Sequence, residues 1–97
     1  MTEIGQFVYS KNGRTRGGPY VVFSVLGEYV CIIDGKSFPI SKPKKKKQKH
    51  MQATNFRSEE IHFKLINKAY INDAEIRKAI KNSGLAIIPR GESLVEE

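Results

Sequence analysis

The chain has 97 residues, of which 39% are hydrophobic and 28% are charged; this length allows one modest hydrophobic core and excludes a second domain. The formal net charge is +7, and the excess belongs to residues 1–57, where eleven Lys and Arg stand against three Asp and Glu. Residues 58–97 carry a net charge of −1. A positive charge confined to one part of a chain favours a polyanionic partner, which is nucleic acid, an anionic membrane face or an acidic protein.

A single cysteine, Cys31, lies in the apolar segment 29–33. One cysteine excludes an internal disulfide, and we interpret it as a small buried hydrophobic residue. The chain starts without a basic stretch followed by a long apolar run, and no segment approaches the ~20 apolar residues of a membrane span. We therefore expect a soluble, cytoplasmic protein without membrane association.

The first part of the chain has the pattern of short strands. Residues 6–10 form the first predicted strand and residues 20–26 the second, whose near-continuous apolar run favours burial on more than one face. Gly27-Glu28 then predicts a tight turn into a third strand over residues 29–34.

Two more strands are predicted downstream. Asp34-Gly35 is a strong turn signal, and residues 36–41 form the predicted fourth strand, which Pro39 keeps at a sheet edge because proline offers no donor to a ladder. A run with six lysines in eight positions follows at residues 42–49 and leads into a predicted fifth strand over residues 50–54. Five short strands with tight turns in about fifty-five residues favour a small SH3-like barrel.

The pattern becomes helical after Arg57. Ser58 is a good N-cap and is followed by two glutamates, which predicts a short helix to about Lys68. Asn72-Asp73-Ala74-Glu75 has the form of a capping box, and Gly84 marks the end of this second helix.

The predicted fold is mainly β with short helices, a five-stranded SH3-like barrel followed by a C-terminal helical segment. Residues 1–56 form the barrel, and residues 57–84 form two short helices packed on it. Residues 85–97 are expected to be a flexible or loosely packed tail, in which Leu85, Ile87 and Ile88 could lie against the barrel.

A glycine-rich basic loop separates the first two predicted strands. It contains Gly13, Gly17 and Gly18, which permit positive φ angles and close approach of a partner to the backbone. Arg14 and Arg16 lie in the same loop, and an arginine can fork onto a phosphate or stack on a base. It is not a phosphate loop, because it lacks the Gly-Lys-Ser/Thr ending and joins two strands.

This stretch resembles the KOW motif of ribosomal proteins and transcription elongation factors. The matching residues are Gly5, Val8, Gly13, Arg14, Gly17, Val21, Val22 and Val25. Residues 42–55 resemble the continuation found in small bacterial KOW-domain RNA-binding proteins, which are similar in turn to KOW-bearing large-subunit ribosomal proteins of archaea and eukaryotes. The resemblance implies an SH3-like barrel and a partner that is ribosomal or other structured RNA, with ribosomal proteins as further candidate partners.

We expect an RNA-binding protein, ribosome-associated or acting in translation, that is monomeric when free and holds RNA by its phosphate backbone. The lysines act as point charges, and Tyr20 is either a face for base stacking or a core residue. The candidate RNA-binding residues are Lys11, Asn12, Gly13, Arg14, Arg16, Gly17, Tyr20, Lys42, Lys44, Lys45, Lys46, Lys47, Lys49 and His50.

The alternative is a protein-interaction module of the KOW or SH3-like type in transcription or translation machinery. Its contact would come from the hydrophobic tail or from the helix that bears Arg77, Lys78 and Lys81. The lysine run also fits a solvated sheet edge, a nuclear localisation signal or a lipid-binding patch, which we rank below nucleic acid. Enzyme activity, a metal and a cofactor are not expected, because His50 and His62 have no partners at a ligand spacing.

Overall fold

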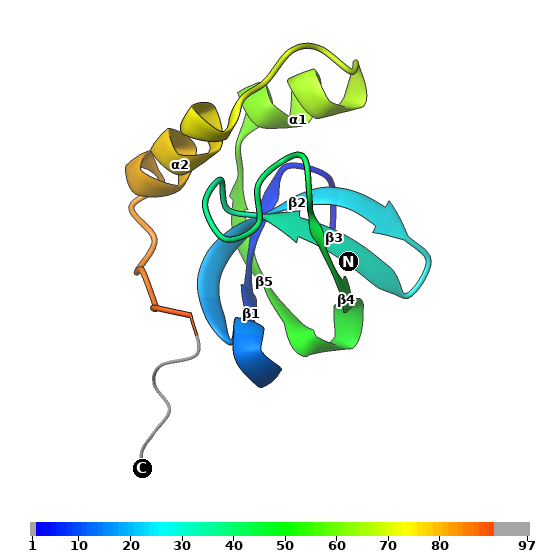
Figure 1. The fold of residues 1–97 in the computed structure, drawn as a ribbon, viewed down its shortest axis with the longest axis vertical. Helices are drawn as coiled ribbons and strands as arrows, with labels where there is room; N and C mark the ends of the chain where they lie inside the picture. The colour runs from blue at the N-terminus through cyan, green and yellow to red at the C-terminus, as the bar shows by residue number, and fades with distance from the viewer. Residues whose placement is uncertain (1, 91–97) are drawn as a thin grey trace.

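The computed structural model describes residues 2–90, and its framework is a five-stranded antiparallel sheet with two α-helices (Figure 1). The strands follow the order β4-β3-β2-β1-β5, so β4 and β5 are the two edges and the sheet is not closed. Their bounds are β1 Gln6–Ser10, β2 Gly17–Leu26, β3 Tyr29–Ile33, β4 Lys44–Lys47 and β5 Met51–Arg57. The predicted mainly β class and the number of strands are confirmed, although one of the strands lies elsewhere in the chain than predicted.

The sheet curls strongly, and β5 runs beneath the β2–β3 hairpin in the view of Figure 1. Three irregularities of register contribute to the curl, and one of them lies in the pairing of β1 with β5, between Gln6 and Val8. The pairing of β1 with β2 shifts between Val8 and Ser10, and that of β2 with β3 shifts between Val22 and Ser24. An extra residue in one strand bends that strand and increases its local twist.

Both faces of the sheet are buried, because side chains alternate between two hydrophobic cores along each central strand. The first core, on one face, consists of Val8, Tyr20, Val22, Val30, Ile32 and Met51. The second core, on the other face, consists of Phe7, Val21, Ile33, Ile61 and Ile76. The burial on more than one face that the apolar run 20–26 predicts is confirmed.

The two helices have the bounds α1 Glu59–Ile66 and α2 Asp73–Asn82, and each begins with the predicted side-chain cap. Ser58 Oγ accepts a hydrogen bond from the backbone N–H of Ile61 (3.2 Å), and Asn72 Oδ1 accepts one from that of Glu75 (2.9 Å). Ile61 of α1 and Ile76 of α2 are buried in the second core, so both helices cover that face of the sheet. Over residues 2–90, neither helix is long and apolar enough to cross a membrane.

The prediction of a fourth strand over residues 36–41 is wrong. These residues form a loop, because Asp34 Oδ1 accepts hydrogen bonds from the backbone N–H groups of Lys36 (2.8 Å) and Phe38 (2.9 Å) and folds the chain into a turn. Pro39 has no N–H to offer a neighbouring strand. The fourth strand is instead formed by the lysine run itself, which pairs with β3.

Two other strands are longer than predicted. The second strand begins at Gly17, inside the predicted loop, and the fifth extends to Arg57. In both cases pairing with β1 adds residues that lack a strong strand pattern of their own.

The C-terminal segment, residues 85–90, is paired with the start of β2. The backbone N–H of Gly18 donates to Ile88 O (2.9 Å), and the N–H of Ile88 donates to Gly18 O (2.7 Å). Tyr9 Oη also donates to Ala86 O (2.6 Å). This part of the predicted tail therefore follows a defined path across the end of the sheet.

Only one of the three apolar side chains expected to lie against the sheet from this segment packs against a core, and it is partly buried. Leu85 packs against the second core, whereas the side chains of Ile87 and Ile88 are 62% and 42% exposed. Residues 91–97 of the predicted tail lie outside the described residues.

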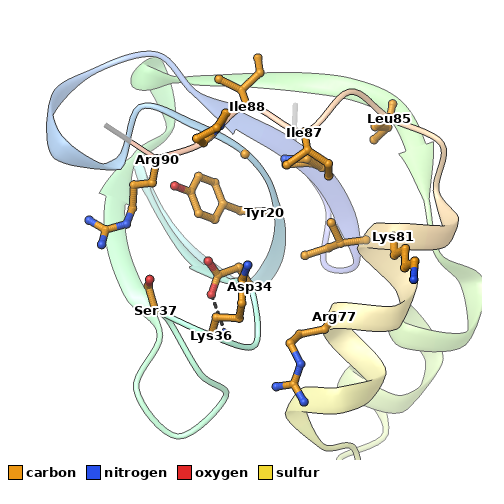
Figure 2. A pocket seen from close by; sticks show the side chains of 14 residues that line it. Tyr20, Asp34, Lys36, Ser37, Arg77, Lys81, Leu85, Ile87, Ile88 and Arg90 are labelled. Carbon is orange, nitrogen blue, oxygen red and sulfur yellow. Dashed lines mark hydrogen bonds between the residues drawn. The ribbon is translucent and has the colours of Figure 1, made fainter. Parts of the chain in front are cut away.

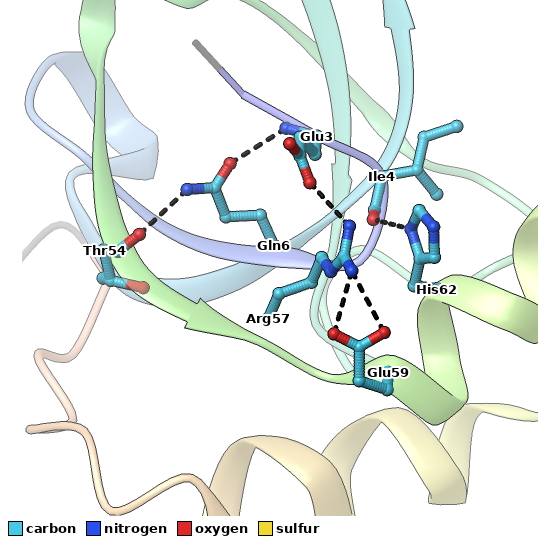
Figure 3. A network of polar contacts seen from close by, with 7 residues as sticks. All are labelled: Glu3, Ile4, Gln6, Thr54, Arg57, Glu59 and His62. Carbon is cyan, nitrogen blue, oxygen red and sulfur yellow. Dashed lines mark hydrogen bonds and ion pairs between the residues drawn. The ribbon is translucent and has the colours of Figure 1, made fainter.

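A polar network ties the N-terminal residues to the junction of β5 and α1 (Figure 3). Arg57 Nη1 donates to Glu3 Oε1 (2.6 Å) and Arg57 Nη2 to Glu59 Oε2 (2.8 Å). The hydrogen bonds that Arg57 donates to Glu59 hold the pKa of the Glu59 carboxyl below its usual value. His62 Nδ1 forms a hydrogen bond with Ile4 O (2.7 Å), which attaches α1 to the same segment.

Gly5, one of the residues on which the resemblance to the KOW motif rests, lies directly against α1. Its φ is +88°, and a Cβ atom there would come within 2.9 Å of the Cα atom of His62. A side chain at this position would therefore collide with the helix backbone. Glycine at position 5 has a packing reason in this fold that is independent of any ligand.

Candidate nucleic-acid interface

The basic loop between β1 and β2 is a short, anchored turn. Residues Gly13–Thr15 form a 3-10 helix, η1, and the side chain of its last residue, Thr15, is buried. Thr15 Oγ1 and Ser10 Oγ are 2.8 Å apart in a hydrogen bond, and Tyr20 Oη donates to Thr15 O (2.7 Å). The loop is therefore held by its buried residue, while Arg14 on the same turn remains exposed.

Tyr20 has no face available for stacking a base. Its side chain is 2% exposed and belongs to the first core, where its ring packs against Phe38 at a centroid distance of 5.7 Å. Burial, with a contribution from the carboxylate of Asp34, raises the pKa of Tyr20 to about 12. Of the two alternatives for Tyr20, a stacking face or a core residue, the structure shows the core residue. Its hydroxyl holds the loop through the hydrogen bond to Thr15 O.

Gly17 also has a packing role in the fold and is not accessible to a ligand within the described residues. It is buried, with φ +124°, and a Cβ atom there would lie 2.5 Å from Ile88 O and 2.9 Å from Pro89 O. The C-terminal segment thus occupies the space that a ligand would need to approach this glycine.

The lysines of β4 alternate between the two faces of the sheet edge. Lys44 and Lys46 pair with Ile32 and Val30, which belong to the first core, while Lys45 and Lys47 pair with Cys31 and Tyr29. Paired residues share a face, so successive lysines point to opposite sides. Lys45 Nζ lies 4.6 Å from the centre of the Tyr29 ring, a cation–π contact on the face away from the first core.

The turn after β4 brings the lysine run back to the basic loop. Residues Gln48–His50 form a second 3-10 helix, η2, and His50 O accepts a hydrogen bond from the backbone N–H of Lys11 (2.8 Å). A Cβ atom at Gly13 would lie 3.9 Å from Lys46 Nζ. In Figure 1 the turn after β1 and the turn after β4 lie at the end of the sheet opposite to the helices.

We name the resulting surface the basic end. It consists of Lys11, Asn12, Gly13, Arg14, Arg16, Lys46, Lys49 and His50, of which Lys46 and His50 are half-buried and the others are exposed. Of the other predicted site residues, Lys42 and Lys44 lie toward the opposite end of β4, and Lys45 and Lys47 point to the other face. The fold thus brings eight of the fourteen candidate residues together.

The positive charge of the basic end is not neutralised within the described part of the chain. Over residues 2–90, the ion pairs join Arg57 to Glu3 and Glu59, and Lys64 to Glu60 and Glu75. None of these involves a cation of the basic end. Arginine and lysine side chains without carboxylate partners remain available to an external anion.

A cleft lies on the other side of Gly18, between the start of β2, α2 and the C-terminal segment (Figure 2). Its volume is about 390 Å³. Lys36, Arg77, Lys81 and Arg90 are its cationic side chains, Asp34 its carboxylate, and Ile80, Leu85, Ile87 and Ile88 form much of its apolar wall. No local sequence pattern predicts this cleft, because four separate segments of the chain contribute to it.

Neither comparison with known proteins gives a relative for this chain: no protein-family model matches it, and no curated protein sequence matches it significantly. Within residues 2–90, no three His, Cys, Asp or Glu side chains come together in a way that could hold a metal ion.

Proposed function

We propose that this protein binds RNA by its phosphate backbone, through the basic end. The observation that carries the proposal is the hydrogen bond between Lys11 N and His50 O, which joins the basic loop to the turn after the lysine strand. Cations from both segments then form one surface, which a single nucleic-acid strand can contact. Lys46 and Lys49 would neutralise phosphates, and the anchored Arg14 would orient the backbone by paired hydrogen bonds.

The choice of RNA over DNA rests on the resemblance to KOW-domain RNA-binding proteins. We propose that the curled five-stranded sheet is an SH3-like barrel of KOW type, and that the partner is ribosomal or another structured RNA. The exposed backbone of the loop at Gly13, with φ +69°, supports close contact with a phosphate. The protein would then be a cytoplasmic, ribosome-associated factor or one that acts in translation.

The test is the affinity for a structured RNA, a single-stranded RNA and a DNA duplex of matched length, each titrated with salt. We expect the structured RNA to bind best, and the slope of log K against log salt on the single strand to be about −4, which corresponds to ~6 phosphates. Arg14→Glu/Arg16→Glu should weaken RNA binding at least tenfold, because two phosphate contacts become repulsive.

The matched control is Lys68→Glu/Lys78→Glu, which makes the same change in net charge at two exposed positions in the helical part. It should change the RNA affinity by less than threefold. If both double variants weaken binding equally, only net charge matters, and the basic end is not the binding site.

The second candidate function, a protein-interaction module, is favoured by one observation. Phe63, Ile66 and Tyr70, in and after α1, are 64%, 50% and 79% exposed. Large apolar side chains gathered at one end of a small protein are typical of a contact surface. In that case Arg14→Glu/Arg16→Glu would leave partner binding intact, and Phe63→Ser would remove it.

A further inference from the structure

The cleft between β2, α2 and the C-terminal segment has the size of a binding site for a small ligand. Its volume of about 390 Å³ is in the lower part of the range of ~300–1,000 Å³ that is usual for ligand sites. Figure 2 shows Ile87 and Ile88 on one side, Arg77 and Lys81 of α2 on another, and Asp34 and Lys36 opposite the two isoleucines. One nucleotide would fit this space.

The apolar wall suits a flat ring. Ile87 and Ile88 belong to a segment whose backbone is fixed by pairing with Gly18, yet their side chains are 62% and 42% exposed. An unstacked base placed between them and Ile80 would cover apolar surface that residues 2–90 leave open. Nucleobases taken out of a stack are commonly held between apolar side chains in this way.

The cations around the wall suit a phosphate. Arg77 Nη1 donates to Gly35 O (2.7 Å), which fixes the guanidinium and leaves its other N–H groups for an anion. Lys36 and Lys81 are exposed at the same cleft. The guanidinium of Arg90, 5.7 Å from the centre of the Phe38 ring, is the fourth cation that lines the cleft.

Asp34 indicates which kind of anion would bind. Its Oδ1 accepts the N–H groups of Lys36 and Phe38, and within the described residues no hydrogen bond is made to Oδ2. A carboxylate in the wall repels a simple anion such as free phosphate. Asp34 Oδ2 can instead accept a hydrogen bond from the amino group of a base, as carboxylates do from cytosine N4.

The cleft continues from the basic end. Gly18 lines it, and Arg16 of the basic end lies two residues before Gly18 in the chain. We propose that the cleft binds one unpaired nucleotide of the RNA that the basic end holds, with its base against Ile87 and Ile88 and its phosphate at Arg77 and Lys81. This inference rests on the proposed RNA-binding function and adds to it a preference for RNA with an extruded nucleotide.

The first arm of the test uses free mononucleotides on the full chain. Backbone amide NMR shifts are followed with AMP, GMP, CMP and UMP, and with inorganic phosphate at equal ionic strength. We expect a nucleotide with a base amino group to shift the amides of residues 34–37, 85–88 and 90, and phosphate to leave them unchanged. Asp34→Asn, which keeps the Oδ1 acceptor of the turn, should weaken this nucleotide at least threefold.

The second arm uses a hairpin RNA with one bulged nucleotide and the same hairpin fully paired. The wild type should bind the bulged RNA about tenfold more tightly, the effect expected from holding one base. Lys36→Glu/Lys81→Glu should abolish this preference, whereas the control Lys68→Glu/Lys78→Glu should keep it. Arg14→Glu/Arg16→Glu should weaken both RNAs and leave the free-nucleotide shifts in place.

The outcomes separate the two proposals. If phosphate shifts the cleft amides as strongly as nucleotides do, or if the bulge gives no preference, the inference about the cleft is overturned and RNA binding at the basic end stands. If Arg14→Glu/Arg16→Glu leaves both RNA affinities unchanged, the proposed function fails. Nucleotide shifts that persist in that case would assign the cleft to a free nucleotide and overturn its role in RNA binding.

Discussion

Tyr20 connects the hydrophobic core to the basic loop. Its ring lies in the first core, while its hydroxyl donates to Thr15 O at 2.7 Å, directly under the turn that carries Arg14. A change at this buried residue therefore affects both stability and the position of an exposed arginine. Because the hydroxyl is buried, it also makes the stability of the fold depend on pH.

Tyr20→Phe removes that hydroxyl and leaves Thr15 O without its donor, which should lower the free energy of unfolding by about 1–3 kcal/mol at pH 7. The folded-state pKa of about 12 lies above the ordinary value of 10.0, so the folded protein keeps the proton that the unfolded chain loses first. The advantage of the wild type is therefore complete below pH 10 and declines as pH rises toward 12. Urea unfolding of both proteins should show the difference shrinking by about 1 kcal/mol between pH 9 and 11.

Gly17, the first residue of β2, is the point at which β2 and the C-terminal segment touch. With φ +124° and with Ile88 O 2.5 Å from a Cβ atom placed there, Gly17→Ala meets both backbone strain and a collision. We expect a loss of at least about 2 kcal/mol in unfolding free energy and faster amide exchange at Ile88.

Gly27→Ala is the matched control, because φ is +63° there but no atom lies within 4 Å of the added Cβ. It should cost only about 1 kcal/mol, which is the strain of the left-handed backbone. Equal losses in the two variants would show that the C-terminal segment does not press on Gly17.

Strand β4 is formed almost entirely by its pairing with β3. Four consecutive lysines have a weak preference for a strand, and as an edge strand they also discourage association with a second sheet. Because successive side chains of a strand point to opposite faces, neighbouring lysines have different surroundings. Lys46 points toward the basic loop, while Lys45 lies over the Tyr29 ring on the other face.

Lys46→Thr and Lys45→Thr therefore form a matched pair with the same change in charge. We expect Lys46→Thr to weaken RNA binding and to reduce the magnitude of the salt slope by about 1, since one phosphate contact is lost. Lys45→Thr should leave the slope nearly unchanged. The measurement is a salt titration of RNA affinity for both variants. A larger effect of Lys45→Thr than of Lys46→Thr would show that the faces assigned by the register of β4 do not determine which lysine contacts RNA.

The whole molecule is held together by the second core, in which residues of the sheet meet both helices. Ile76 of α2 is fully buried against Phe7, Val21 and Ile33 of three different strands. The helices therefore have no core of their own and depend on the sheet for burial of their apolar faces. We expect sheet and helices to unfold as one unit.

Ile76→Ala should lower the free energy of unfolding by about 2–5 kcal/mol, because it leaves a cavity between α2 and the sheet. Circular dichroism and tyrosine fluorescence should still give a single coincident transition. Ile66→Ala, at a side chain that is 50% exposed, is the control and should cost less than about 1 kcal/mol. Separate transitions for helix and sheet would contradict the shared core.

Local patterns in the sequence predicted most of the helices and strands and, among the fourteen candidate site residues, the eight that the fold brings together. The cap residues Ser58 and Asn72 predicted both helix starts, because a cap is a contact within four residues. The prediction for residues 36–41 failed because apolar alternation competed with the hydrogen bonds of Asp34, which no periodicity reveals. The basic loop and lysine run were evident as charge, but their alignment on one surface was not.

Short-range spacing and composition are enough to predict the class of the fold, the caps of the helices and the concentration of positive charge in residues 1–57. Four other features are visible only in the folded chain: the lysine run is an edge strand, Tyr20 is core, Lys11 meets His50, and a cleft opens beside Gly18. Each of these depends on contacts between residues far apart in the chain. Such contacts are set by strand pairing and burial together, which no local pattern encodes.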